Sequence, residues 1–93
     1  MKINSLDNLS VLKQIICLQS ELSMNDIGHC IILKGLIGDV TGMNISLIAI
    51  QRLFGFTPSK FLPSLYTLNT LAFYCGYGDW ETFTWRFCRT LMI

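Results

Sequence analysis

Residues that start and end helices divide the second half of the chain into short segments. Ser46, Ser64 and Asp79 each stand at or just before an apolar run, and a side-chain oxygen there can accept a hydrogen bond from an otherwise unpaired backbone N–H of a helix's first turn. Gly55 and Gly76 follow two of these runs, where the left-handed backbone that ends many helices favours glycine. The pattern predicts three short helices after residue 45.

The first half of the chain carries the same signals. Leu9, Leu12 and Ile16 recur at helical spacing, and so do apolar residues after residue 26. No segment alternates apolar and polar residues long enough to indicate a strand. The expected fold class is therefore all-α, a compact orthogonal bundle of about five helices in a single domain, 1–93. The expected boundaries are N-caps at Ser5 or Asp7 and at Asn25 or Asp26, an end of the first helix within 20–23, and a loop over 39–44 that turns at Gly42.

The last three predicted helices each present an apolar side to a core. The clearest stripe, in the fourth helix, has helical spacing. In the fifth helix, Trp85, Arg86 and Arg89 lie on a different side from the apolar residues. The apolar positions are Ile48, Ile50, Leu53 and Phe54 in the third helix, Leu65, Leu68, Leu71, Ala72 and Cys75 in the fourth, and Trp80, Phe83, Phe87 and Leu91 in the fifth.

Charge is scarce in this sequence. Apolar residues make up 52% of the chain and charged residues 14%, against about 45–50% and about 25% in ordinary domains. A domain of 93 residues has a small interior and cannot hide that much apolar surface alone. The chain is therefore expected to self-associate, or to be one piece, such as the N-terminal part, of a larger regulatory protein.

A membrane location is not expected. The apolar stretches 27–40 and 45–56 are interrupted by charged and polar residues such as Lys34, Asp39 and Arg52, whereas a spanning helix needs about 20 apolar residues in succession. Asp7, Lys13 and Gln14 break any signal-peptide core. These features favour a cytoplasmic protein.

Catalysis, metals and cofactors are not indicated by any motif. The four cysteines, Cys17, Cys30, Cys75 and Cys88, form no Cys-x-x-Cys pair and are expected to be free, buried thiols. A zinc site of Cys17, His29 and Cys30 with a distant fourth ligand is conceivable, although the spacing matches no compact pattern. No phosphate-binding glycine loop or converging nucleophile and base is evident. The chain is therefore not expected to be an enzyme or to bind a small-molecule substrate.

The stretch 45–83 resembles a known family. It reads ISLIAIQRLFGF, then PSLYTLNTLAFYCGY, then GDWETF. This resembles a helix-turn-helix-like module found at the N-terminus of varied Bacteroidetes proteins. More distantly, it is similar to lambda-repressor-like DNA-binding domains. The resemblance covers under half of the chain and rests on caps, stops and core positions. It implies a helix-turn-helix-like core over about 25–83 and a role in transcription regulation.

Two functions of different classes follow. Lambda-repressor-like domains read DNA with their third helix, so the resemblance implies DNA contacts at Ser46, Leu47, Ala49, Gln51, Arg52 and Lys60. A net charge of +1 and an apolar third helix favour instead a protein-interaction or self-association module. Its expected contact residues are Leu47, Ile50, Trp85, Arg86 and Arg89, because Trp and Arg are enriched at interface hot spots.

Overall fold

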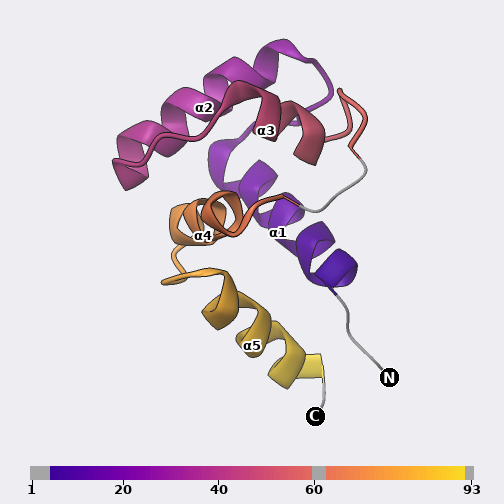
Figure 1. Cartoon of the computed structure of the whole chain (residues 1–93), viewed down its shortest axis with the longest axis vertical. Helices are drawn as coiled ribbons and strands as arrows, with labels where there is room; N and C mark the ends of the chain where they lie inside the picture. The colour runs from indigo at the N-terminus through magenta and orange to yellow at the C-terminus, as the bar shows by residue number, and fades with distance from the viewer. Residues whose placement is uncertain (1–4, 60–62, 92–93) are drawn as a thin grey trace.

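The computed structural model describes residues 5–59 and 63–91, and leaves out the side chains of residues 5–7 and 87–91. Over these ranges the chain is all-helical, without strands, as predicted. Figure 1 shows the helices running in different directions around a common centre. They are α1 (Ser5–Ser20), α2 (Gly28–Thr41), α3 (Leu47–Leu53), α4 (Leu65–Tyr74) and α5 (Trp80–Leu91).

The three predicted caps in the second half of the chain are confirmed. Each side-chain oxygen accepts a hydrogen bond from the backbone N–H three residues later, which satisfies a donor that the helix itself leaves unpaired. The bonds run from Ala49 N to Ser46 Oγ (3.0 Å), from Thr67 N to Ser64 Oγ (3.2 Å) and from Thr82 N to Asp79 Oδ1 (2.7 Å).

Glycines with positive φ follow three of the helices. Gly42, Gly55 and Gly76 have φ of 70°, 83° and 93°, so the predicted turn at Gly42 and the predicted stops at Gly55 and Gly76 are confirmed. The predicted loop over 39–44 is wrong in its first part, because α2 continues to Thr41. The helix ends only when the Gly42 N–H bonds to the Gly38 carbonyl at 2.9 Å.

The link between α1 and α2 differs in detail from the prediction. Asp26 Oδ1 accepts from the Gly28 N–H at 3.1 Å, so this predicted cap does bond the start of α2, while Ile27 occupies the position next to the helix. Glu21 and Met24 have positive φ of 60° and 58°. These backbone conformations could not be predicted from the sequence, because neither residue is glycine. The caps expected at Ser5 or Asp7 lie outside the described side chains.

All five helices contribute to one hydrophobic core. Phe83 of α5 is fully buried, with the ring of Tyr77 edge-on at 5.0 Å and that of Trp80 stacked at 5.5 Å between centroids. Ile48 and Leu65, which are among the apolar positions of the predicted helices, are exposed. Phe87 and Leu91 lie outside the described side chains. The core side chains are Leu12, Ile16, Met24, Cys30, Leu33, Ile37, Ile45, Ile50, Leu53, Leu71, Ala72, Tyr74 and Phe83.

The packing of the helices places α2 at the edge of the molecule. α4 packs against α1, α2 and α5, while α2 also packs against α3. In Figure 1, α2 crosses the top of the molecule with α3 and α4 on one side of it. The opposite side of α2 is therefore open to solvent.

Candidate protein interface

The surface of α3, which was expected to contact DNA, is small. Ile48 and Arg52 are its exposed side chains, and one helical turn separates them. The other three expected contact residues in the helix, Leu47, Ala49 and Gln51, are partly buried. The Ser46 hydroxyl is already bonded to the Ala49 N–H. Lys60 lies outside the described residues.

One residue expected at a protein interface is part of the core instead. Ile50 is 0% exposed, because the short α3 turns positions 50 and 53 inward together. A helix of seven residues has fewer than two full turns, so these two inward positions use most of its apolar side. Ile50 cannot contact a partner in this fold.

Leu47, which was also expected at the interface, is partly buried on α3, and the remaining three expected residues lie on α5. Trp85 is 62% exposed, as an anchor for a partner should be. The Arg86 guanidinium lies over the ring of Tyr77, 5.8 Å from its centroid, an arrangement that holds the cation at the protein surface. The side chain of Arg89 lies outside the described ones. On the described residues, α5 therefore offers one large exposed aromatic side chain next to an arginine.

A small polar network fixes the connector in front of α3. Lys34 Nζ donates to Asn44 Oδ1 at 2.9 Å, and the Tyr66 hydroxyl donates to the Asn44 carbonyl at 2.9 Å. The network ties α2 and α4 to the segment that leads into Ser46. Lys34 thus has a structural hydrogen bond, which reduces its availability to a phosphate.

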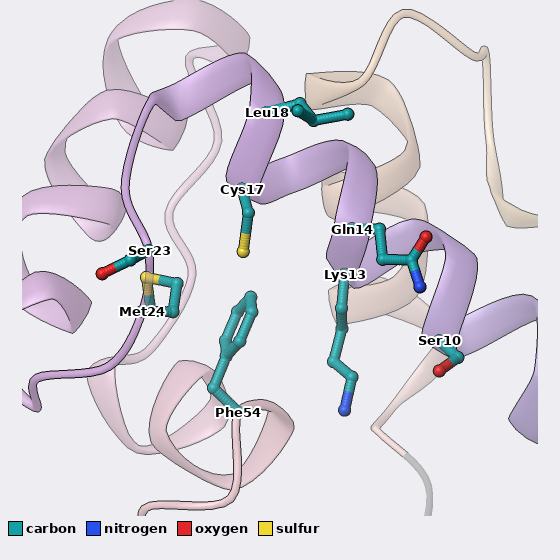
Figure 2. Close-up of a pocket in the computed structure, with 8 residues that line it drawn as sticks. All are labelled: Ser10, Lys13, Gln14, Cys17, Leu18, Ser23, Met24 and Phe54. Atoms are coloured by element: carbon teal, nitrogen blue, oxygen red, sulfur yellow. The ribbon is translucent and has the colours of Figure 1, made fainter.

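An open groove of about 500 Å³ runs beside α1. Figure 2 shows the Cys17 sulfur, Met24 and the Phe54 ring pointing toward one another at one end of it. Lys13 lies next to them, and its Nζ donates to the Leu53 carbonyl at 3.4 Å, where a cation also complements the negative end of α3. The groove is lined by Ser10, Lys13, Gln14, Cys17, Leu18, Ser23, Met24 and Phe54.

The chemistry of the groove does not resemble that of an active site. Burial raises the pKa of the Cys17 thiol, and the nearby Lys13 charge lowers it by less. The thiol is therefore protonated near neutral pH, and a protonated thiol is a poor nucleophile. The Lys13 amine is bonded to a backbone carbonyl. The groove is better suited to holding an apolar side chain than to catalysis.

The open side of α2 exposes apolar side chains to solvent. Its residues follow the helical spacing i, i+3, i+4, i+7 and i+11, and all five are exposed. Ile31 is 64% exposed, and a Cβ placed on Gly35 meets no described atom within 4 Å. We call this surface the outer face of α2, defined by Gly28, Ile31, Ile32, Gly35 and Asp39.

The sequence-based predictions missed the outer face of α2. Gly35 and Gly38 indicate a weak helix end by propensity, which concealed the continuation of the helix to Thr41. The composition of α2 nevertheless indicated an apolar surface, because Lys34 and Asp39 are the only residues of the Lys, Arg, Asp and Glu types in the helix. A helix without a polar side must be covered on more than one side, or stand at an interface.

Other classes of site find no support in the described part of the chain. No group of three or more His, Cys, Asp or Glu side chains there could hold a metal ion, so the conceivable site of Cys17, His29 and Cys30 is not assembled. No described helix is long and apolar enough to cross a bilayer. Comparisons of the chain with models of protein families, with curated proteins and with solved structures found no match.

Proposed function

We propose that this chain is a non-enzymatic protein-interaction module that binds its partner through the outer face of α2. One observation carries the proposal. Ile31 and Ile32 stand on the open side of a helix at the edge of the molecule, between two exposed glycines and without a neighbouring lysine or glutamate on that face. Such a surface gains from being covered by another protein.

The energetic reason is the hydrophobic effect. Each apolar Å² removed from water contributes roughly 25 cal/mol, and the two isoleucines are more than half exposed. An ordinary surface helix turns charged residues to solvent and its apolar stripe to the core. α2 turns apolar residues both ways, because Cys30, Leu33 and Ile37 fill its inner side. The outer isoleucines are therefore not needed for the core.

The pattern of charge on α2 supports a protein partner rather than a nucleic acid. Interface centres are depleted in charged residues, and the centre of the outer face has none. Lys34 is turned toward Asn44. A nucleic acid would require several cations on one surface.

Site-specific photocrosslinking tests the proposal. A photoreactive amino acid replaces Ile31 in one variant and Ile48 in the other. The two positions are matched in residue type and exposure, 64% and 54%. In cells that express the chain, we expect a covalent protein adduct from position 31 that disappears when Ile32→Glu is added. Equal labelling from both positions, or no protein adduct from position 31, contradicts the proposed interface.

DNA binding is the second candidate function. Its support is the exposed Arg52 at the end of the Ser46-capped helix α3, in the part of the chain that resembles helix-turn-helix modules. The connector over residues 42–46 is longer than the 3–4-residue turn typical of that motif. This function predicts gel retardation of duplex DNA that weakens with salt and with Arg52→Ala. Absence of retardation at low salt would rule it out.

A further inference from the structure

We infer that the partner segment on the outer face of α2 is an α-helix with an apolar centre and a basic residue at each end, which rests on the proposed function because it states the chemistry of the protein that covers the same surface. Three observations carry this inference. A carboxylate lies at each end of the face, the centre between them is apolar, and the two glycines leave open space.

The first carboxylate, that of Asp26, borders the N-terminal end of the face. Its Oδ1 accepts a hydrogen bond from the Gly28 N–H at 3.1 Å. A Cβ placed on Gly28 would lie 3.7 and 3.8 Å from the two Asp26 carboxylate oxygens. Asp26 is exposed, and a carboxylate has about four acceptor sites, of which this bond uses one. The remaining sites are open to a donor on a partner.

The second carboxylate, that of Asp39, belongs to the face itself at its C-terminal end. Asp39 is exposed, and α2 has no basic residue in its last turn. The charge of Asp39 therefore adds to the negative end of the helix dipole. The single lysine of the helix, Lys34, donates to Asn44 instead. This end of the face thus carries negative charge that a cation on a partner would balance.

Like charges at both ends disfavour several other occupants. A second copy that placed its α2 antiparallel on this face would bring Asp39 beside Asp26, and a parallel copy would bring Asp39 beside Asp39. Nucleic acids and anionic lipid surfaces carry the same sign as the two carboxylates. Juxtaposed like charges oppose association, whereas a complementary charge favours it. A partner with a cation at each end gains at both.

The shape of the face suits the side chains of a helix. Ile31 and Ile32 project between Gly28 and Gly35, and a Cβ placed on Gly35 meets no described atom within 4 Å. Ridges on one helix fit into such hollows on another, and a helix brings no unpaired backbone groups to an apolar surface. The face extends about 16 Å from Gly28 to Asp39. A helix lying along it therefore needs its two cations about eleven residues, or three turns, apart.

A synthetic peptide of this design tests the inference on the full chain. The peptide is a helix of about 18 residues with two arginines eleven positions apart, three leucines between them on the same side, and alanine and glutamine elsewhere. Amide NMR should show shifts centred on residues 28–39, with a dissociation constant on the order of 100 μM. In the control peptide both arginines are glutamates. It should bind about tenfold more weakly, and the difference should shrink as salt is added.

Matched variants locate the contact. Asp39→Asn removes one carboxylate from the face and should weaken binding of the arginine peptide about two- to fivefold, as expected for an exposed ion pair. Glu81→Gln removes the same charge from an exposed position on α5 and should leave the affinity unchanged. Ile31→Glu should abolish binding, and Ile48→Glu should not. Helical circular dichroism verifies that each variant is folded.

Several results would overturn the inference. The arginine peptide could fail to bind, could bind no better than the glutamate peptide, or could shift signals mainly outside α2. Equal weakening by Asp39→Asn and Glu81→Gln would show that charge at the face is not recognised. A chain that sediments as a dimer without peptide, and as a monomer after Ile31→Glu, would make a second copy the occupant.

The same experiments separate this inference from the proposed function. If the probe at position 31 crosslinks a protein while the arginine peptide does not bind α2, the stated chemistry of the partner is wrong and the interface stands. If the probe captures no protein, the interface itself is wrong.

Discussion

At the residue scale, three helices begin with a side-chain oxygen bonded to a backbone N–H. Ser46, Ser64 and Asp79 each satisfy one donor in the first turn of the helix that follows. The chemistry needs only the cap residue and the next three positions, so it does not depend on the tertiary fold. Ser64 also donates to the Thr67 hydroxyl at 3.1 Å, which adds a side-chain partner at the start of α4.

Replacing the cap of α4 should lower stability measurably. Ser64→Ala leaves the Thr67 N–H without its acceptor and should reduce the free energy of unfolding by about 1 kcal/mol. Ser64→Asn, which retains an acceptor oxygen, is the matched control and should cost much less. Urea unfolding followed by circular dichroism measures both. Equal losses would show that the hydrogen bond is not what stabilises this helix start.

The Asp79 cap should make stability depend on acidity. The hydrogen bond from the Thr82 backbone N–H, supported by the Thr82 side chain, lowers the pKa of the Asp79 carboxyl from its ordinary value of 3.8. Because the folded-state pKa is the lower one, this contribution is present above the unfolded pKa and disappears as the pH falls through the folded pKa.

Asp79→Asn keeps an acceptor oxygen at the cap but removes the titration. At neutral pH this variant should unfold at lower urea concentration than the wild type. The difference should shrink as the pH is lowered below about 4. A difference that is constant across this range would mean that the Asp79 charge does not contribute to folding.

Cys75 should react slowly in the folded chain. Burial raises the pKa of its thiol to about 12, so the reactive thiolate is scarce at pH 8. Alkylation at Cys75, resolved by peptide mass spectrometry, should be at least about a hundredfold slower than in the urea-unfolded chain, because three pKa units change the thiolate fraction about a thousandfold. Rapid alkylation at this site in the folded chain would contradict its burial.

At the element scale, α2 contributes to both the hydrophobic core and the candidate interface. Its inner side supplies Cys30, Leu33 and Ile37 to the core, and its outer side presents Ile31 and Ile32 to solvent. A single sequence stretch thus serves two surfaces. The helix retains two exposed or partly exposed glycines in its interior at some cost in propensity, which is consistent with a need for a flat face.

Two glycine substitutions should change stability in opposite directions. Gly76→Ala forces a Cβ into a backbone with φ of 93° and should lower the free energy of unfolding by about 1–2 kcal/mol. Gly35→Ala lies inside a helix with open space around the new methyl group, and should raise it by about 1 kcal/mol. Thermal unfolding at low protein concentration compares them. Destabilisation by both would mean that Gly35 is constrained by something other than helix propensity.

The predictability of these elements follows from the range of the interactions involved. Caps and stops such as Ser46 and Gly76 depend on a few consecutive residues, and the sequence indicated them correctly. The side of each short helix that faces inward depends on how the helices pack. Ile50 was therefore expected at an interface and lies in the core, whereas Leu65, which belongs to the apolar stripe of its helix, is exposed. The positive φ of Met24 likewise depends on tertiary structure.

At the scale of the whole molecule, the structure shows where the excess apolar surface lies. The sequence predicted excess apolar surface from 52% apolar and 14% charged residues, but could not place it. The structure leaves large apolar side chains exposed on all five helices. On α2 they form, with two glycines, a continuous face that the described chain does not cover. The candidate site was thus predictable in kind and not in position.

Photocrosslinking from positions 31 and 48 tests most directly the central claim, that the outer face of α2 binds another protein. The two isoleucines that the probe replaces are similarly exposed. The account predicts a protein adduct from position 31 that is lost when Ile32→Glu is added, and no equal adduct from position 48. Equal labelling from both positions, or no protein adduct from position 31, would contradict the account.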